Sequence, residues 1–474
     1  MYTAFLERRP CFLNKVSAQH EKEGEYFMKL TYGVNDKPAF PQLIIYAFQQ
    51  VLAIMAATIT VPMVVGNGMS TAAALFGAGI GTLTYVLFTK KKSPVFLGSS
   101  FAFIGSMTAA FAGAVSLQAG YAGLIIGALF AGLVYVVLAL AVRASGTGWI
   151  DRLMPAVVIG PTVSIIGLSL AGSAISNLQV SSATGAETNI AILCGIIALF
   201  ATMLASTYGN SGIRMIPFII GILCGYAVAL IFTLIGTSIG NADLQIISFQ
   251  SFQALSEGGI TLKTFLQVPD FTFLTAAKGF SQIDTEYLGV LFMAYVPVAF
   301  VVFAEHIADH KNISSIIGTD LLKDPGLDHT LLGDGIGSMV GAFFGGCPNT
   351  TYGESIACVA ITRNASTVTI IAAAIECIIL SFFSPIVAFI SSIPSCVMGG
   401  VCMALYGFIA VSGLKMIQNV DLEDGRNLFV VSVILIAGIG GLTLNFSHVT
   451  LTAVATALIL GIVVNKMLGA PKKN

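Results

Sequence analysis

The chain has 474 residues, of which 56% are hydrophobic and 9% charged, and its formal net charge is −1 at pH 7. A soluble globular protein carries about 25% charged residues and could not bury so much apolar surface, which excludes a water-soluble fold. The composition therefore predicts an all-α polytopic membrane protein embedded in a lipid bilayer, and we expect no nucleic-acid partner.

Residues 1–41 are predicted to form a cytoplasmic N-terminal segment. The part from Met1 to Lys29 is polar and charged, without the apolar region of a signal peptide, so we expect no cleavable signal. Residues 21–25 could be encoded by a purine-rich ribosome-binding sequence ahead of Met28. Met1 and Met28 are therefore alternative starts, which N-terminal sequencing would distinguish.

Apolar runs bounded by Gly, Pro and charged residues predict about fourteen membrane segments, each close to the ~20 residues that a spanning helix needs. In chain order they cover residues 42–66, 70–89, 95–112, 118–142, 153–174, 188–207, 213–237, 285–308, 329–346, 348–362, 366–389, 394–414, 427–443 and 448–468.

Two of these segments are interrupted. Pro94 and Pro348 each precede a short β-compatible stretch with Gly, Ser or Thr, followed by a helix of small residues. They are the third segment of each half, and paired interruptions of this kind indicate an inverted-repeat transporter with its site at the repeat interface. Two unrelated glycine-kinked helices remain the alternative. The predicted organisation is a first repeat over 42–237, an external loop over 238–284, a second repeat over 285–468 and a cytoplasmic C-terminal tail over 469–474.

The basic residues predict the orientation. With a cytoplasmic N-terminus, only Lys263 and Lys278 of the 22 Lys and Arg residues fall outside, both in the external loop. Because loops rich in Lys and Arg stay in the cytoplasm, this favours an even number of spans. We expect a multi-pass protein of the cell (inner) membrane with both termini cytoplasmic.

Carboxylates within apolar segments are the strongest functional signal, because an ionisable group in hydrocarbon costs at least ~2.5 kcal/mol unless it is paired or faces a cavity. Glu305 and Asp309 are four apart and share a helix face. Glu354 begins a half-helix, where free N–H groups favour negative charge. The alternatives are a simple N-cap for Glu354 and a solvated position at the cytoplasmic mouth for Asp309. No role is assigned to Glu376.

Phe101 follows the first interruption and could stack on a flat ligand or belong to the core. His306 is interpreted first as an inter-helix hydrogen-bonding group and second as a proton relay. The sequence contains no HExxH pattern and no CxxC pair, so we expect neither an enzyme nor a bound metal or cofactor.

Several motifs in order resemble the nucleobase/ascorbate transporter family, and within it the bacterial uracil carriers. The similar stretches are Leu97 to Phe103, Gly146 to Trp149, Ala304-Glu305-His306, Lys323 to Leu327, Gly333-Asp334-Gly335, Asn349 to Arg363 and Pro394 to Gly400, so the resemblance runs from about Gly33 to Lys466.

This resemblance implies two inverted seven-helix repeats forming a core domain (segments 1–4 and 8–11) and a gate domain (segments 5–7 and 12–14). It implies a homodimer in which the core slides against the gate. It also implies a substrate site made by Glu305, Glu354, Phe101, Tyr352, Gly353 and Ala57, to which we add Ser100. Glu305, Asp309 and His306 are the expected proton-coupling residues.

The chain departs from the family at several positions. Gln50 stands where a histidine is common, Ser355 where an asparagine is common and Ala357 where a glycine is usual, while Asp309 stands where some relatives carry histidine. The expected function is proton-coupled import of uracil, and Glu354 favours uracil because purine-type relatives more often have glutamine there. A xanthine or other purine permease and sodium coupling remain alternatives. A channel would show a polar ring along a pore, which the clustered charges do not indicate.

Overall fold

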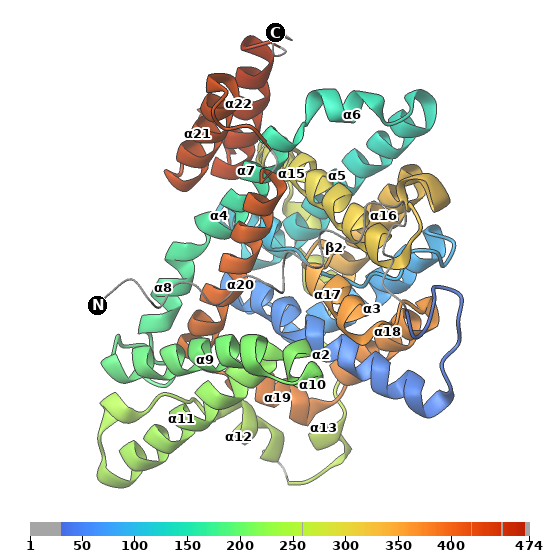
Figure 1. The fold of residues 1–474 in the computed structure, drawn as a ribbon. Coiled ribbons are helices and arrows are strands. Elements are labelled where there is room, and N and C mark those ends of the chain that lie inside the picture. The colour runs from blue at the N-terminus through green and yellow to red at the C-terminus, as the bar shows by residue number, and fades with distance from the viewer. Residues whose placement is uncertain (1–29, 258, 419, 447–448, 470–474) are drawn as a thin grey trace, which may run out of the picture.

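The computed structural model describes residues 30–257, 259–418, 420–446 and 449–469 (Figure 1). Both alternative starts, Met1 and Met28, lie outside the described residues. The described chain is mostly helical, and its four short strands form two antiparallel pairs.

The first half contains the first seven predicted segments. Its elements are α2 (Phe40–Val65), α3 (Thr71–Phe88), β1 (Leu97–Ser99), η1 (Phe101–Phe103), α4 (Ile104–Ala112), α5 (Leu117–Ser145), α6 (Gly148–Leu153), α7 (Ala156–Ser169), α8 (Ala171–Gln179), α9 (Asn189–Tyr208), α10 (Ser211–Met215) and α11 (Pro217–Ile239). The predicted fifth segment is thus two helices, α7 and α8.

The loop predicted to be external, residues 238–284, contains several short helices. It contains η2 (Ala242–Leu244), α12 (Gln250–Ser256), α13 (Leu262–Phe265), α14 (Thr272–Ala276) and η3 (Phe280–Gln282). Helices α12 and α13 pack on α19, which belongs to the second half.

The second half repeats the order of the first. Its elements are α15 (Thr285–Ile317), η4 (Leu322–Gly326), α16 (Leu327–Gly345), β2 (Asn349–Thr351), α17 (Gly353–Thr362), α18 (Thr367–Ser381), α19 (Ser384–Ser392), α20 (Ser395–Met416), α21 (Gly425–Ile439), β3 (Leu444–Phe446), β4 (Val449–Leu451) and α22 (Ala453–Met467). The eleventh segment is α18 with α19, and the β3–β4 hairpin before α22 was not predicted.

Side-chain caps explain where many of the helices begin. The side chains of Ser70, Ser116, Thr188, Asp284 and Thr452 accept hydrogen bonds from the first turns of α3, α5, α9, α15 and α22. Such caps satisfy N–H groups that have no partner within the helix. Among the described residues, eight helices are long and apolar enough to cross a membrane.

The two interrupted segments pair with each other at the centre of the molecule. Strands β1 and β2 are antiparallel, with Gly98 opposite Thr350. Only glycine fits at position 98, because a Cβ there would lie 2.4 Å from the ring of Tyr352. The half-helices α4 and α17 therefore start from one shared two-stranded unit.

The helices form two groups (Figure 1). In the first group, α16 packs on α3 and α5, and α18 packs on α2 and α3; in the second, α20 packs on α7, α8 and α9, and α21 packs on α7 and α22. Small residues allow close contact within the first group: a Cβ on Gly77 of α3 would lie 2.5 Å from the carbonyl oxygen of Gly341 of α16.

Candidate functional site

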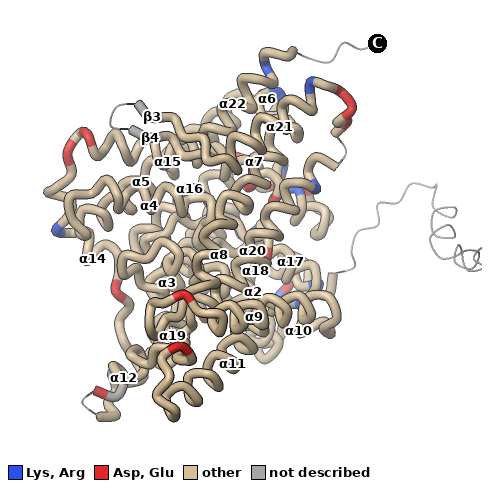
Figure 2. Tube along the Cα trace, turned by 90° about the vertical axis from the view of Figure 1, so that its left-hand side faces the viewer, with Lys and Arg blue, Asp and Glu red and all other residues tan. Residues whose placement is uncertain are grey.

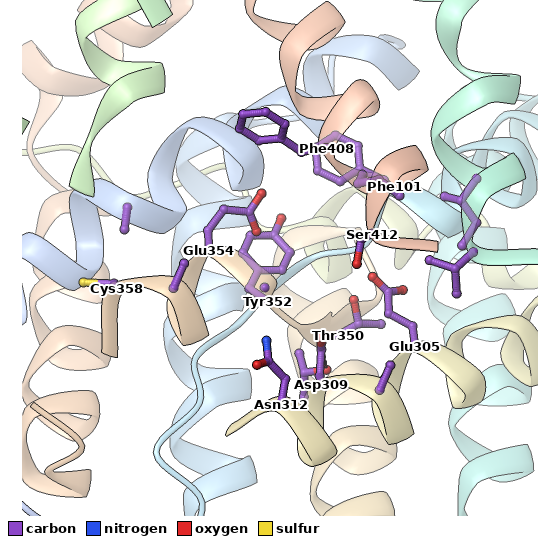
Figure 3. Close-up of a pocket in the computed structure, with 18 of the residues that line it drawn as sticks. Phe101, Glu305, Asp309, Asn312, Thr350, Tyr352, Glu354, Cys358, Phe408 and Ser412 are labelled. Atoms are coloured by element: carbon purple, nitrogen blue, oxygen red, sulfur yellow. Dashed lines mark hydrogen bonds between the residues drawn. The ribbon is translucent and has the colours of Figure 1, made fainter. Parts of the chain in front are cut away.

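A cavity of about 400 Å³ lies where the two groups meet (Figure 3). The first group contributes residues of α2, η1, α15, β2 and α17, and the second contributes residues of α7, α9, α10, α11 and α20. Six of the predicted site residues line it together: Phe101, Glu305, Asp309, Tyr352, Gly353 and Glu354.

Helix α15 presents a polar stripe to this cavity. Glu305, Asp309 and Asn312 all line it, as expected for positions spaced by four and three residues on one helix face. The hydroxyl of Thr351 donates to Asp309 Oδ2 at 2.7 Å, which connects α15 to β2. Asp309 therefore accepts a hydrogen bond from a neutral donor at the wall of the cavity.

The start of α17 forms the opposite side of the cavity. Glu354 is the second residue of this helix, and Tyr352 at the N-cap donates its hydroxyl to the carbonyl of Ser99 at 2.6 Å. The first N–H groups of a helix have no partner within it, so they can donate to a ligand. A Cβ on Gly353 would meet no atom within 4 Å, which leaves the backbone accessible from the cavity.

Phe101 lies in the core and also borders the cavity. It lines the cavity, and its ring is packed edge to face against Tyr406 of α20, with ring centroids 5.6 Å apart. It is 8% exposed. In Figure 3 it lies beside Phe408, so aromatic surface covers one side of the cavity that holds the carboxylates.

Three predicted site residues do not line the cavity. Ala57 is buried in α2, and Ser100 donates its backbone N–H to the carbonyl of Pro348 at 2.9 Å. His306 faces away into the first group, where its Nδ1 lies 2.7 Å from Asp334 Oδ2 and its Nε2 lies 3.0 Å from the hydroxyl of Thr330. Both contacts join α15 to α16, as the first interpretation of His306, an inter-helix hydrogen-bonding group, predicted.

Two of the departures from the family motifs contact each other. The side-chain amide of Gln50 donates to both the hydroxyl and the carbonyl of Ser355, the latter at 3.3 Å. The same hydroxyl accepts the backbone N–H of Phe96 at 2.9 Å. Together these bonds connect α2 and the residue before β1 to the first turn of α17.

Several lining residues were missed by the sequence reasoning. Asn312 continues the stripe of Glu305 and Asp309 and could have been found from its spacing. Arg214 on α10 and Ser412 on α20 come from the second group, and only tertiary structure brings them to the cavity. In Figure 3 Ser412 lies opposite Glu305. Glu376 on α18 is not among the lining residues.

The cavity contains the charges of a binding site for a polar ligand. Glu305, Asp309 and Glu354 are its acidic lining residues, and Arg214 is its basic one; Arg214 donates to the carbonyl of Thr207 at 2.8 Å. Among the described residues, no group of three or more His, Cys, Asp or Glu side chains is arranged to hold a metal ion.

The sequence is similar to known permeases over nearly its whole length. The uracil permease of Bacillus subtilis is 37% identical over 452 residues, covering 94% of this chain and 97% of that protein. The uracil permease of Bacillus caldolyticus is 36% identical, covering 93% of this chain and 95% of that protein. That of Escherichia coli is 35% identical, covering 91% and 92%.

Two solved structures share the fold at low identity. The transmembrane domain of the cyanobacterium bicarbonate transporter BicA has a TM-score of 0.57 at 15% identity and covers 91% of this chain and 100% of that chain. Murine solute carrier 26 family member A9, an anion transporter in the inward-facing state, has a TM-score of 0.60 at 11% identity and covers 97% and 76%.

These comparisons confirm the predicted class of a polytopic membrane protein with inverted repeats. They also agree with the expectation that the chain is not an enzyme, because the relatives are named permeases. The family model matches residues 41–446. The chain therefore belongs to the Permease family of xanthine and uracil permeases.

Proposed function

We propose that this protein is a secondary transporter that imports uracil together with protons. The observation that carries the proposal is the single cavity in which Glu305, Glu354 and Phe101 converge from three separate elements. The relatives named uracil permeases, at 35% to 37% identity over more than nine-tenths of the chain, support this choice of substrate.

The lining chemistry matches a flat ring with polar edges. Uracil offers two N–H donors and two carbonyl acceptors. The carboxylates of Glu305 and Glu354 accept from N–H groups, and the free N–H groups at the start of α17 donate to a carbonyl. Phe101 supplies the face on which the ring stacks, and the cavity volume lies within the range of small-molecule sites.

The distribution of polar side chains supports movement of one group against the other. All three carboxylates belong to the first group, which corresponds to the core domain. The second group, which corresponds to the gate, lines the cavity mainly with apolar side chains such as Val163, Phe218 and Phe408. A core that carries all three carboxylates can slide along this mainly apolar wall and expose the site to either side.

Proton coupling is assigned to Glu305 and Asp309. They lie one turn apart on α15, and the pair has no lysine or arginine hydrogen-bonded to it among the described residues. A bound proton would remove one of two neighbouring negative charges, so proton binding and uracil binding can be linked at this helix face.

The charge distribution supports insertion in the cell membrane with both termini cytoplasmic. In Figure 2 most Lys and Arg residues lie on the side of the molecule where the C-terminus lies. Most of the charged residues on the opposite side are Asp and Glu. This is the asymmetry expected when basic loops stay in the cytoplasm. The family resemblance further supports a homodimer.

Uptake by proteoliposomes tests the proposal. Radiolabelled uracil should accumulate saturably when the exterior is acidic, and a protonophore should abolish the accumulation. Unlabelled uracil should compete more strongly than xanthine or hypoxanthine. Stronger competition by xanthine would assign a purine substrate instead, and non-saturable uptake would indicate a channel.

A further inference from the structure

A second and much smaller cavity, of about 10 Å³, lies inside the first group. This is close to the smallest volume that holds one water molecule. Its lining includes the polar residues Tyr135, Asp334, Ser338 and Thr350. Thr350 also lines the large cavity, so this residue of β2 belongs to the walls of both spaces.

Two buried polar atoms belong to residues of this small cavity and have no hydrogen-bond partner among the described residues. They are Asp334 Oδ1 and the hydroxyl of Tyr135, and their residues are 1% and 4% exposed. Buried polar atoms of this kind nearly always bind protein or ordered water, because leaving them unpaired costs about 1–3 kcal/mol.

The position of Asp334 is fixed by its other oxygen. His306 Nδ1 lies 2.7 Å from Asp334 Oδ2, and His306 Nε2 lies 3.0 Å from the hydroxyl of Thr330. The ring of Tyr135 stands edge to face against the same imidazole, with ring centroids 6.0 Å apart. The carboxylate therefore cannot turn to Tyr135 without losing its histidine.

We propose that one water molecule binds in the small cavity, bridges Asp334 Oδ1 and the Tyr135 hydroxyl, and connects the substrate cavity through Thr350 to the Asp334–His306 pair. Its function is to pass the coupled proton to an acceptor outside the substrate site. This inference rests on the proposed proton coupling. It adds a path and an acceptor that Glu305 and Asp309 do not supply.

The Thr350 hydroxyl and the water each release one proton for every proton that they bind. A proton arriving from the substrate cavity binds the Thr350 hydroxyl as that hydroxyl releases its own to the water. The water in turn releases one to Asp334 Oδ1, so only the carboxylate gains a proton. The titratable groups around Asp334 are Tyr85 from α3, Tyr135 from α5, and Glu305, His306, Asp309 and His310 from α15.

The transport test compares two buried tyrosines that each lose only a hydroxyl. Tyr135→Phe keeps the ring against His306 but removes one water ligand. Tyr295→Phe is the matched control, because its hydroxyl is also buried without a partner among the described residues but does not line the small cavity. Uracil exchange at equal pH and accumulation driven by a pH gradient are measured in proteoliposomes.

With a gradient of one pH unit and one proton per uracil, accumulation can reach about tenfold. We expect Tyr135→Phe to lower this ratio to near one while exchange is retained, and Tyr295→Phe to leave both unchanged. Normal accumulation by Tyr135→Phe, or an equal loss in both variants, would overturn the proton path. Absence of accumulation in the unmodified protein would instead overturn proton coupling itself, and the path with it.

The water is tested separately by determining the structure of the unmodified protein and of Tyr135→Phe at a resolution that shows ordered solvent. We expect one density peak within hydrogen-bonding distance of both Asp334 Oδ1 and the Tyr135 hydroxyl, weakened or lost in the variant. Side chains that close the space without a peak would refute the water site. A peak that requires sodium, together with accumulation driven by a sodium gradient alone, would refute it in favour of a cation site.

Discussion

At the scale of single residues, the site depends on where Glu354 lies. As the second residue of α17, its carboxylate stands beside N–H groups that have no partner within the helix. The start of α17 thus offers both a carboxylate that accepts hydrogen bonds and backbone N–H groups that donate them. A ring that carries both N–H and carbonyl groups requires both. The simple N-cap interpretation is wrong, because the N-cap of α17 is Tyr352 and Glu354, two positions later, lines the cavity.

Replacing Glu354 by glutamine should weaken uracil binding by roughly ten- to hundredfold, since hydrogen bonds to charged groups contribute about 1.5–3 kcal/mol. The amide would present a donor toward an N–H donor of the ring. Isothermal titration of the purified variant measures the change. Glu376→Gln, whose carboxyl is in a membrane helix but outside the cavity, should bind uracil normally. Equal affinity in both variants would remove Glu354 from the site.

Asp309→Asn should separate binding from coupling. In the unmodified protein the Thr351 hydroxyl donates to Asp309 Oδ2 at 2.7 Å. The side-chain oxygen of asparagine can accept the same hydrogen bond, so we expect the contact of α15 with β2 to persist. The variant cannot bind a proton at this position. We expect uracil binding and exchange to remain and accumulation driven by a pH gradient to disappear, because net transport requires a proton to leave. Undiminished accumulation would return Asp309 to the interpretation of a solvated residue.

At the scale of elements, hydrophobic patterning was sufficient to find the fourteen segments and both interruptions. It could not find what depends on contacts between distant parts of the chain. The β3–β4 hairpin pairs Leu444 with Leu451, in a part of the sequence that resembles any other break between apolar runs. Arg214 and Ser412 lie on segments that look ordinary in sequence, and only packing of the two groups brings them to the cavity. The Gln50–Ser355 contact likewise joins positions 305 residues apart.

Gly98→Ala should damage the paired strands. The added methyl group would lie 2.4 Å from the ring of Tyr352 and 2.9 Å from the hydroxyl of Thr58. Overpacking of this kind usually costs about 1–3 kcal/mol. We expect a lower melting temperature and weaker uracil binding, measured by thermal unfolding with and without uracil. Gly105→Ala, where the nearest atom would be 3.9 Å away, is the matched control and should leave both unchanged.

At the scale of the whole molecule, the two groups and the charge asymmetry lead to a test of orientation. In a background with Cys11 and Cys224 replaced by serine, single cysteines are introduced at Lys278 in the external loop and at Lys323 before α16. A membrane-impermeant thiol reagent should label Lys278→Cys in intact cells. It should label Lys323→Cys only after the cells are permeabilised. The opposite pattern would reverse the proposed topology, and labelling of both in intact cells would contradict the single membrane span predicted between Lys278 and Lys323.

The pairing of β1 with β2 also sets an order of events during synthesis. Tyr352 and Ser99, which are hydrogen-bonded at this junction, are 253 positions apart. When the first half has entered the membrane, the backbone N–H and C=O groups of β1 have no strand to bind, and such groups are costly in hydrocarbon. The nascent protein must therefore hold an unsatisfied segment, shielded by neighbouring helices or by the insertion machinery, until β2 is made. Ribosome stalling or truncation between the two halves would release a chain whose exposed strand is a target for membrane quality control.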